Sequence, residues 1–354
     1  MIKKTALTVA LIVILIMAGL VSYAKIQMRK VSDLSFEQAL EYTTRDNPDA
    51  VITVGIIKDG RMSYKVYGEN GRELPDELHT YEIGSLTKTF TAALVNRAIL
   101  EGKINIDESI EKYLLLPAGN GYPTIRELLT HTSGYKGYYF ENPMIENHLK
   151  GRNDFYGISK DAVYIKMSKL SMGNDRYDYR YSNFGYAVLG LLLEEVYGED
   201  YTALLNEFAA DELGLSDTHV SDQNGDLGNC WEWNEDDAYI SAGAVTSNIA
   251  DMLNYAQLQL DNDPDFDNCH KSLRKIDAST KAYEAMDIRM DEIGMAWIID
   301  EENGIIWHNG GTGDYNCYLG FEPGEGKAVV ILSNLSPDYR IPATVMGVKL
   351  LKEL

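Results

Sequence analysis

Strand-like segments lie near both ends of this 354-residue chain, and helix-like segments lie between them. Ala50–Ile57 is a β-branched run that meets Met62–Tyr67 across Lys58-Asp59-Gly60-Arg61, and Asp-Gly between two such runs is a strong hairpin signal. Further strands, separated by turns that contain glycine, are predicted at Gly294–Asp300, Gly304–His308, Cys317–Glu322 and Lys327–Ser333. This arrangement favours one antiparallel sheet shared by the two ends of the chain.

Between these strands, apolar residues recur with a helical period from about Asp107 to Gly214. Helices are predicted at Ser85–Leu100, Ile125–Leu129, Lys160–Leu170, Asn183–Tyr197, Ala250–Leu260 and Pro342–Leu354. The pattern predicts an α+β domain over residues 31–354, in which a helical lobe at about residues 107–235 is inserted into a lobe built on the sheet. A cleft between two lobes is the usual place for a small-molecule site.

The first thirty residues have the composition of an export segment. Lys3 and Lys4 precede an apolar run from Ala6 to Val21, and Ser22-Tyr23-Ala24 supplies the small residues of a signal-peptidase site. We therefore expect residues 1–30 to be a cleaved signal peptide or a retained membrane anchor. The protein would then be secreted or held on the outer side of the cytoplasmic membrane.

Charge and cysteine content exclude several classes of protein. A formal net charge of −22 argues against a nucleic-acid partner, because nothing balances a run of phosphates. Three cysteines at wide spacing, Cys230, Cys269 and Cys317, exclude a disulfide framework and a zinc-ribbon pattern. One bridge plus one free thiol stays open, and the sequence does not indicate which pair would form it.

The first motif with chemical content is Ser85-Leu86-Thr87-Lys88. Positions three apart on a helix share a face, so the Lys88 amine can reach the Ser85 hydroxyl and take its proton. The pattern is weak alone, because the chain contains other Ser-x-x-Lys matches such as Ser272…Lys275. A surface serine beside a solvated lysine is the ordinary reading of a single match.

Two further motifs follow Ser85 along the chain. Tyr181-Ser182-Asn183 opens an apolar helix, where a phenol can relay a proton and an amide can hold a lysine or a substrate; helix capping is the simpler reading. His308-Asn309-Gly310-Gly311 follows an apolar strand, and its glycines allow a substrate to approach the strand backbone. A hairpin turn with a satisfied histidine is the simpler reading there.

Taken together and in this order, the three motifs resemble those of the penicillin-recognising serine enzymes: Ser-x-x-Lys, a triplet ending in Asn, and Lys- or His-x-Gly. Flanking segments resemble the branch related to class C β-lactamases, namely Tyr81–Gly84, Leu128–Gly134, Ser241–Ser247, Tyr318–Phe321 and Val329–Asn334. The resemblance covers roughly Leu34 to the C-terminus. It implies a β-lactamase/transpeptidase-like fold, with an antiparallel sheet flanked by helices.

The resemblance also implies a two-step acyl transfer that needs no cofactor and no metal. Ser85 would attack a carbonyl group while Lys88 and Tyr181 handle the proton, and Tyr181 would later activate water. The backbone N–H groups of Ser85 and Gly311 would stabilise the oxyanion.

Three residues would bind the substrate. Asn183 would orient Lys88 and a substrate amide, Gly310 would let the substrate lie close to the strand, and His308 would contact a substrate carboxylate or support the network. His308 stands where β-lactamases and peptidases usually carry Lys, and a neutral imidazole anchors a carboxylate less well than an ammonium group. This departure argues against efficient β-lactam hydrolysis.

We therefore expect an extracytoplasmic serine hydrolase acting on an ester, a D-amino-acid peptide or a related amide, with that small molecule or peptide as its partner. A class C-type β-lactamase and a membrane-held sensor that is acylated without turnover are the alternatives. The sequence contains no Gly-x-Ser-x-Gly, so the nucleophile elbow of α/β-hydrolases is absent. His131, within Thr130–Gly134, is expected to stabilise a turn. The oligomeric state stays open.

Overall fold

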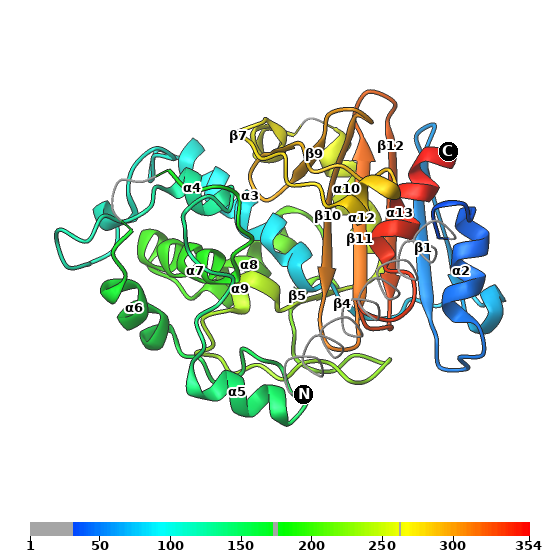
Figure 1. Ribbon diagram of the computed structural model, residues 1–354, viewed down its shortest axis with the longest axis horizontal. Helices are drawn as coiled ribbons and strands as arrows, with labels where there is room; N and C mark the ends of the chain where they lie inside the picture. The colour runs from blue at the N-terminus through cyan, green and yellow to red at the C-terminus, as the bar shows by residue number, and fades with distance from the viewer. Residues whose placement is uncertain (1–30, 173–175, 262) are drawn as a thin grey trace, which may run out of the picture.

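The computed structural model describes residues 31–172, 176–261 and 263–354 (Figure 1). The predicted signal peptide or anchor over residues 1–30 lies outside these ranges. Within them, no helix has both the length and the hydrophobicity needed to cross a bilayer.

The two ends of the described chain share one antiparallel sheet, as predicted. Its strands follow the order β3-β2-β1-β12-β11-β10-β9-β8-β7, and β1 pairs with β12 from Ile52↔Ser333 to Ile57↔Ala328. The bounds are β1 Ile52–Lys58, β2 Arg61–Tyr67, β3 Glu73–Leu74, β7 Arg274–Lys275, β8 Glu292–Ile293, β9 Ile298–Asp300, β10 Ile305–Gly311, β11 Asn316–Glu322 and β12 Lys327–Ser333.

The predicted hairpin between the first two strands is confirmed. Lys58 pairs with Arg61, and the two residues between them have positive φ angles, 51° at Asp59 and 69° at Gly60. Two left-handed residues in a two-residue loop match the twist of the flanking strands, which is why Asp-Gly closes this turn.

Helices cover both faces of the sheet (Figure 1). Helices α2 (Phe36–Thr44) and α13 (Ala343–Glu353) pack together on one face, while α10 (Ile249–Leu260) packs on the other against β1, β11 and β12. Alternate residues of β12 enter two apolar clusters: Val329 and Ile331 join α2 and α13, and Val330 and Leu332 join α10. This period of two is what a strand buried on both faces requires.

The middle of the chain is mainly helical (green in Figure 1). Its longest helix is α7 (Asn183–Tyr197), which packs against α3 (Thr87–Leu100). The other helices are α4 Ile125–Leu129, α5 Asn142–Leu149, α6 Lys160–Lys169, α8 Tyr201–Glu207, α9 Ile240–Gly243, α11 Pro264–Asp267 and α12 Lys281–Ala285. A small sheet in the order β4-β6-β5 joins Tyr81–Glu82, Val245–Ser247 and His219–Val220.

Some predicted boundaries were wrong for local reasons. The strand predicted at Gly294–Asp300 is shorter, because Ala296 has a φ of 69° and the Gly294 N–H bonds to the Trp297 carbonyl in a tight turn. Helix α2 was missed, although Ser35 and Gln38 form a capping box at its start. All three cysteines are free, so no bridge forms.

Candidate active site

Ser85 lies in a single 3-10 turn, Gly84–Leu86, between the short strand β4 and helix α3. The α-helix therefore begins at Thr87 and not at Ser85 as predicted. Gly84 has a φ of 50°, a conformation that disfavours residues with a Cβ atom. A Cβ at this position would also lie 2.6 Å from the backbone nitrogen of Gly311. The nucleophile turn is thus held tightly against strand β10.

The Lys88 amine lies directly behind Ser85. Its Nζ is 3.0 Å from Ser85 Oγ and 2.5 Å from the carbonyl oxygen of Ala242, and the side chain is fully buried. Burial lowers the pKa of this amine well below its ordinary value. Among the described residues no carboxylate forms an ion pair with Lys88. This position suits a lysine that must be a neutral base near pH 7.

Tyr181 lies on the loop that enters α7 and faces the same serine. The residue is 36% exposed, and its hydroxyl lies within hydrogen-bonding reach of Ser85. Burial raises the pKa of this phenol above its ordinary value, and the contact with Ser85 offsets part of that effect. The Lys88 Nζ lies 5.0 Å from the ring centroid. Ser85, Lys88 and Tyr181 therefore form one contiguous group.

His308 lies on β10 and lines the cleft. It is 3% exposed, and its Nδ1 is 2.6 Å from the carbonyl oxygen of Asn309. Burial, with a smaller contribution from Lys88, lowers the pKa of His308 to about 3. A carbonyl can only accept, so Nδ1 carries the proton and Nε2 is a hydrogen-bond acceptor. His308 is thus an uncharged group at neutral pH.

Gly310 and Gly311 allow β10 to approach the nucleophile turn. A Cβ at Gly310 would lie 1.9 Å from the Ile83 carbonyl oxygen, and one at Gly311 would lie 2.4 Å from the Pro337 side chain. Backbone atoms cannot yield as a flexible side chain can. The approach predicted for these glycines was that of a substrate, whereas the close contacts in the structure are made by the protein's own chain, at Ile83 and Pro337.

We expect Gly310→Ala to separate β10 from the nucleophile turn, since the added methyl group would overlap the Ile83 carbonyl. Loss of a well-placed oxyanion donor typically costs about 10²–10³-fold in kcat. The expected result is a loss of that size, together with a lower Tm, measured by turnover and thermal melting. Gly324→Ala is the matched control, because a Cβ there meets no atom within 4 Å. Unchanged turnover in Gly310→Ala would contradict this reading of the strand.

The role predicted for Asn183 needs a correction. It is the first residue of α7, but the Lys88 amine bonds to the Ala242 carbonyl and to Ser85 and not to the Asn183 amide. Among the described residues the Asn183 side chain has no hydrogen-bonding partner. Orientation of Lys88 is therefore provided by the main chain of the segment Ser241–Ser247. That segment was noted in the sequence, but its carbonyl was not assigned a role.

The cleft itself has a volume of about 440 Å³. Five predicted site residues line it: Ser85, Tyr181, His308, Gly310 and Gly311. The cleft also has an apolar and aromatic wall that the sequence did not reveal, made by Tyr179, Tyr283, Met290, Ile298 and Trp307. We call these five residues the apolar wall. Asp, Glu, Lys and Arg do not occur among the lining residues in the described part of the chain.

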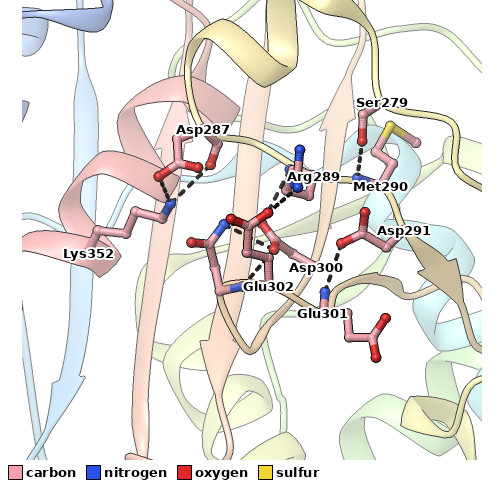
Figure 2. A network of polar contacts seen from close by, with 10 residues as sticks. Ser279, Asp287, Arg289, Met290, Asp291, Asp300, Glu301, Glu302 and Lys352 are labelled. Atoms are coloured by element: carbon pink, nitrogen blue, oxygen red, sulfur yellow. Dashed lines mark hydrogen bonds and ion pairs between the residues drawn. The ribbon is translucent and has the colours of Figure 1, made fainter.

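The segment that carries Tyr283 and Met290 is fixed by a network of polar contacts (Figure 2). The Met290 N–H donates to Ser279 Oγ over 2.7 Å, and the Arg289 N–H donates to the buried Asp300 carboxylate over 3.2 Å. Further contacts in the figure join this segment to β9 and to α13. Two residues of the apolar wall, Tyr283 and Met290, therefore lie on a segment that is anchored to the sheet.

Comparison with known proteins decides the family. The family model described as "Beta-lactamase" matches residues 44–345. The chain belongs to the beta-lactamase family. The match contains every residue of the site described above, and the family assignment made from the three motifs is confirmed.

The fold also matches that of solved structures. A beta-lactamase/D-alanine carboxypeptidase from Yersinia pestis has a TM-score of 0.68 at 18% identity, with 93% of this chain and 98% of that chain covered. A D-stereospecific amidohydrolase from Streptomyces has a TM-score of 0.66 at 21% identity, with 88% and 96% covered. At these identities the likeness shows the fold.

Among curated proteins, protein flp of Staphylococcus aureus strain N315 is 20% identical over 336 residues, which is 87% of this chain and 64% of flp. The chain thus spans less than two thirds of that relative's length. The predicted β-lactamase/transpeptidase-like fold is confirmed, and the protein has the fold of a serine hydrolase.

Proposed function

We propose that this chain is an extracytoplasmic serine hydrolase that forms an acyl-enzyme on Ser85 and acts on an ester, a D-amino-acid peptide or a related amide. The observation that carries the proposal is the buried Lys88 amine, which lies 3.0 Å from the hydroxyl of Ser85 and forms no ion pair within the described part of the chain. A lysine enclosed in this way is costly unless its neutral form is used.

In the proposed acylation step, Ser85 Oγ bonds to the substrate carbonyl carbon and its proton passes to Lys88. Negative charge then develops on the carbonyl oxygen, beside the backbone N–H groups of Ser85 and Gly311. When the tetrahedral intermediate collapses, the bond to the leaving oxygen or nitrogen breaks. That atom receives a proton from the phenol of Tyr181, which is replenished from Lys88.

Deacylation runs the same proton path in reverse. Because its pKa is raised, the Tyr181 phenol stays protonated at neutral pH and is a weak base by itself. Water that attacks the acyl carbon therefore passes its proton through Tyr181 to neutral Lys88, and Ser85 leaves with a proton. In this account Tyr181 relays the proton and Lys88 is the base.

The charge of the cleft favours uncharged substrates. The Lys88 amine lies behind Ser85 and donates a hydrogen bond to the Ala242 carbonyl. The Nε2 atom of His308 offers a lone pair and no proton. A free carboxylate would find no cation among the described lining residues. The net charge of −22 adds a long-range repulsion of anions. Neutral esters fit this environment better than substrates that end in a carboxylate.

The apolar wall suits an apolar acyl group. Burying each methylene of such a group contributes about 0.8 kcal/mol. Met290 lies on the anchored segment of Figure 2, so this part of the wall is in place before the substrate binds. The proposed preference is therefore for an ester whose acyl chain is uncharged and apolar.

The test compares p-nitrophenyl butyrate with p-nitrophenyl hemisuccinate, two esters of similar length that differ in a terminal carboxylate. We expect kcat/KM to be at least about tenfold higher for the butyrate, a difference of about 1.4 kcal/mol. His308→Lys should narrow the ratio, because it adds a cation at the cleft. Equal rates on the two esters, or no ester hydrolysis at all, would contradict the proposal.

A β-lactamase is the second candidate, favoured by the similarity to the Yersinia pestis beta-lactamase/D-alanine carboxypeptidase. β-Lactams carry a carboxylate, so the uncharged cleft is the argument against efficient turnover. Ring opening of a penicillin faster than butyrate hydrolysis would favour this candidate. Stable acylation without release would favour a sensor ectodomain.

The proposal that the protein is exported is based on the sequence of residues 1–30 alone. The sequence of this segment supports a signal peptide or an anchor, as described above. Mass analysis of the mature protein from the producing cell would distinguish a cleaved from a retained segment. Recovery of the whole chain from the cytoplasm would contradict the extracytoplasmic part of the proposal.

A further inference from the structure

His131 holds the chain on both sides of Tyr181. Its carbonyl oxygen accepts the N–H of Arg180 over 2.8 Å, and its ring atom Nδ1 accepts the N–H of Ser182 over 3.1 Å. The imidazole ring also lies against the phenol ring, with 4.5 Å between the two centroids. One residue therefore contacts Tyr181 and both of its neighbours in sequence.

The same residue belongs to the cluster around Lys88. His131 and Lys88 both contact the rings of Tyr181 and Tyr186; His131 lies 5.1 Å and Lys88 5.6 Å from the Tyr186 centroid. His131 is 1% exposed and lines the cleft. Since Nδ1 accepts from an amide N–H, the neutral ring carries its proton on Nε2. Burial and the nearby Lys88 and His308 lower the pKa of His131, which keeps the ring neutral.

Two features of His131 locally destabilise the folded state. His131 has a φ of 56°, which is uncommon and strained for a residue with a Cβ atom. Its Nε2 is buried with no partner among the described residues, which also destabilises the folded state. A residue that only stabilised a turn would need neither feature, since Gly or Asn would fit the backbone better.

We propose that His131 is a positioning residue that fixes the Tyr181 phenol at the Ser85 hydroxyl. It does so through its hydrogen bonds to the backbone N–H groups of Arg180 and Ser182, the residues on either side of Tyr181. The inference rests on the proposed function, because it assigns Tyr181 the proton relay. It replaces the expectation from sequence that His131 only stabilises a turn. His131 does not take a proton in this account.

Two variants separate the effect of the hydrogen bond to Ser182 from the effect of the backbone conformation at position 131. His131→Asn and His131→Gly both tolerate a positive φ, but only Asn offers an oxygen near the place of Nδ1 for the Ser182 N–H. We expect turnover within about tenfold of wild type for Asn. For Gly we expect a loss of about 10²-fold, the typical cost of a small misplacement at a reacting centre. KM should change little in both.

Turnover is expressed per competent site, counted by end-point labelling of Ser85 with a fluorophosphonate and intact mass. In labelling, the Ser85 oxygen bonds to phosphorus, fluoride leaves and the serine proton passes to Lys88. A merely structural role would lower the number of sites without changing turnover per site. His270→Gly is the control, because it removes another largely buried neutral imidazole, bonded to Gln259 outside the cleft. It should lower only the Tm.

A second readout does not depend on activity. 3-Fluorotyrosine placed at Tyr181 should give one sharp ¹⁹F resonance in wild type and in His131→Asn, and a broadened or shifted one in His131→Gly. Equal turnover per site in the Asn and Gly variants, or identical resonances, would overturn the proposal for His131. If the proposed function itself is wrong, wild type will show neither hydrolysis nor labelling of Ser85. The ¹⁹F resonances would then still test whether His131 positions Tyr181.

Discussion

Replacing Ser85 by alanine should abolish ester hydrolysis while leaving the fold unchanged. Without Oγ no covalent acyl-enzyme can form, and removal of a catalytic nucleophile typically lowers kcat by about 10⁴-fold or more. Ser85 is half-buried at the mouth of a 3-10 turn, and its hydroxyl is bonded to Lys88 rather than to the core. The Tm should therefore stay within a few degrees of wild type. Initial rates and thermal melting measure the two quantities.

The matched control is Ser272→Ala. Ser272 and Lys275 repeat the Ser-x-x-Lys spacing, but both residues are exposed and neither lines the cleft. Turnover should be unchanged in this variant. If Ser85→Ala keeps its activity, the assignment of the nucleophile is wrong, however well the three motifs agree.

Replacing Lys88 by methionine should have the second-largest effect. Methionine fills similar volume without the amine, so the proton acceptor for Ser85 is removed and the Ala242 carbonyl loses its donor. General base catalysis typically contributes about 10²–10⁴-fold, and we expect a loss of that size in kcat/KM. Lys275→Met, at the exposed copy of the motif, should have no effect.

The pH dependence follows from the same amine. Only the neutral form of Lys88 can accept the Ser85 proton, so kcat/KM should rise as pH increases through the Lys88 pKa and then level off. Because burial lowers that pKa, the plateau should begin well below pH 10. A rate that keeps rising up to the pKa of an ordinary lysine, about 10.4, would show that Lys88 is charged at neutral pH.

Much of this site could be predicted because its reacting residues lie within short sequence motifs. Ser85 and Lys88 are one helical turn apart, so their contact follows from sequence spacing. The glycines of β10 mark a close approach, although the sequence could not say that the approaching group is the Ile83 carbonyl. The shared sheet followed from strand patterns at both ends of the chain.

The remaining features depend on contacts between distant segments. The carbonyl that orients Lys88 belongs to Ala242, and a backbone atom has no signature of its own in a sequence. The apolar wall combines residues from the loop before α7, from α12 and the loop that follows it, and from two strands, and each of them alone resembles an ordinary core residue. Asn183 was assigned from its motif, and the direction of its side chain depends on packing that the motif does not contain.

His131 shows the same limit. In the sequence it lies within a Thr-His-Thr-Ser-Gly stretch whose composition indicates a turn, and the positive φ confirms that a turn is present. Its bonds to the neighbours of Tyr181 join residues about fifty positions apart. Only the folded structure shows that the histidine in this turn also bonds to the two neighbours of Tyr181.

The most direct test of the central claim is to trap the acyl-enzyme. The protein would be quenched in acid during turnover of p-nitrophenyl butyrate, and in parallel after incubation with a penicillin, then digested with trypsin. The expected fragment, Glu73–Lys88, contains Ser85 as its only serine. We expect a mass increase equal to the butyryl group on Ser85 of this fragment, and no increase in Ser85→Ala. Hydrolysis without any adduct, or an adduct on another residue, would contradict it.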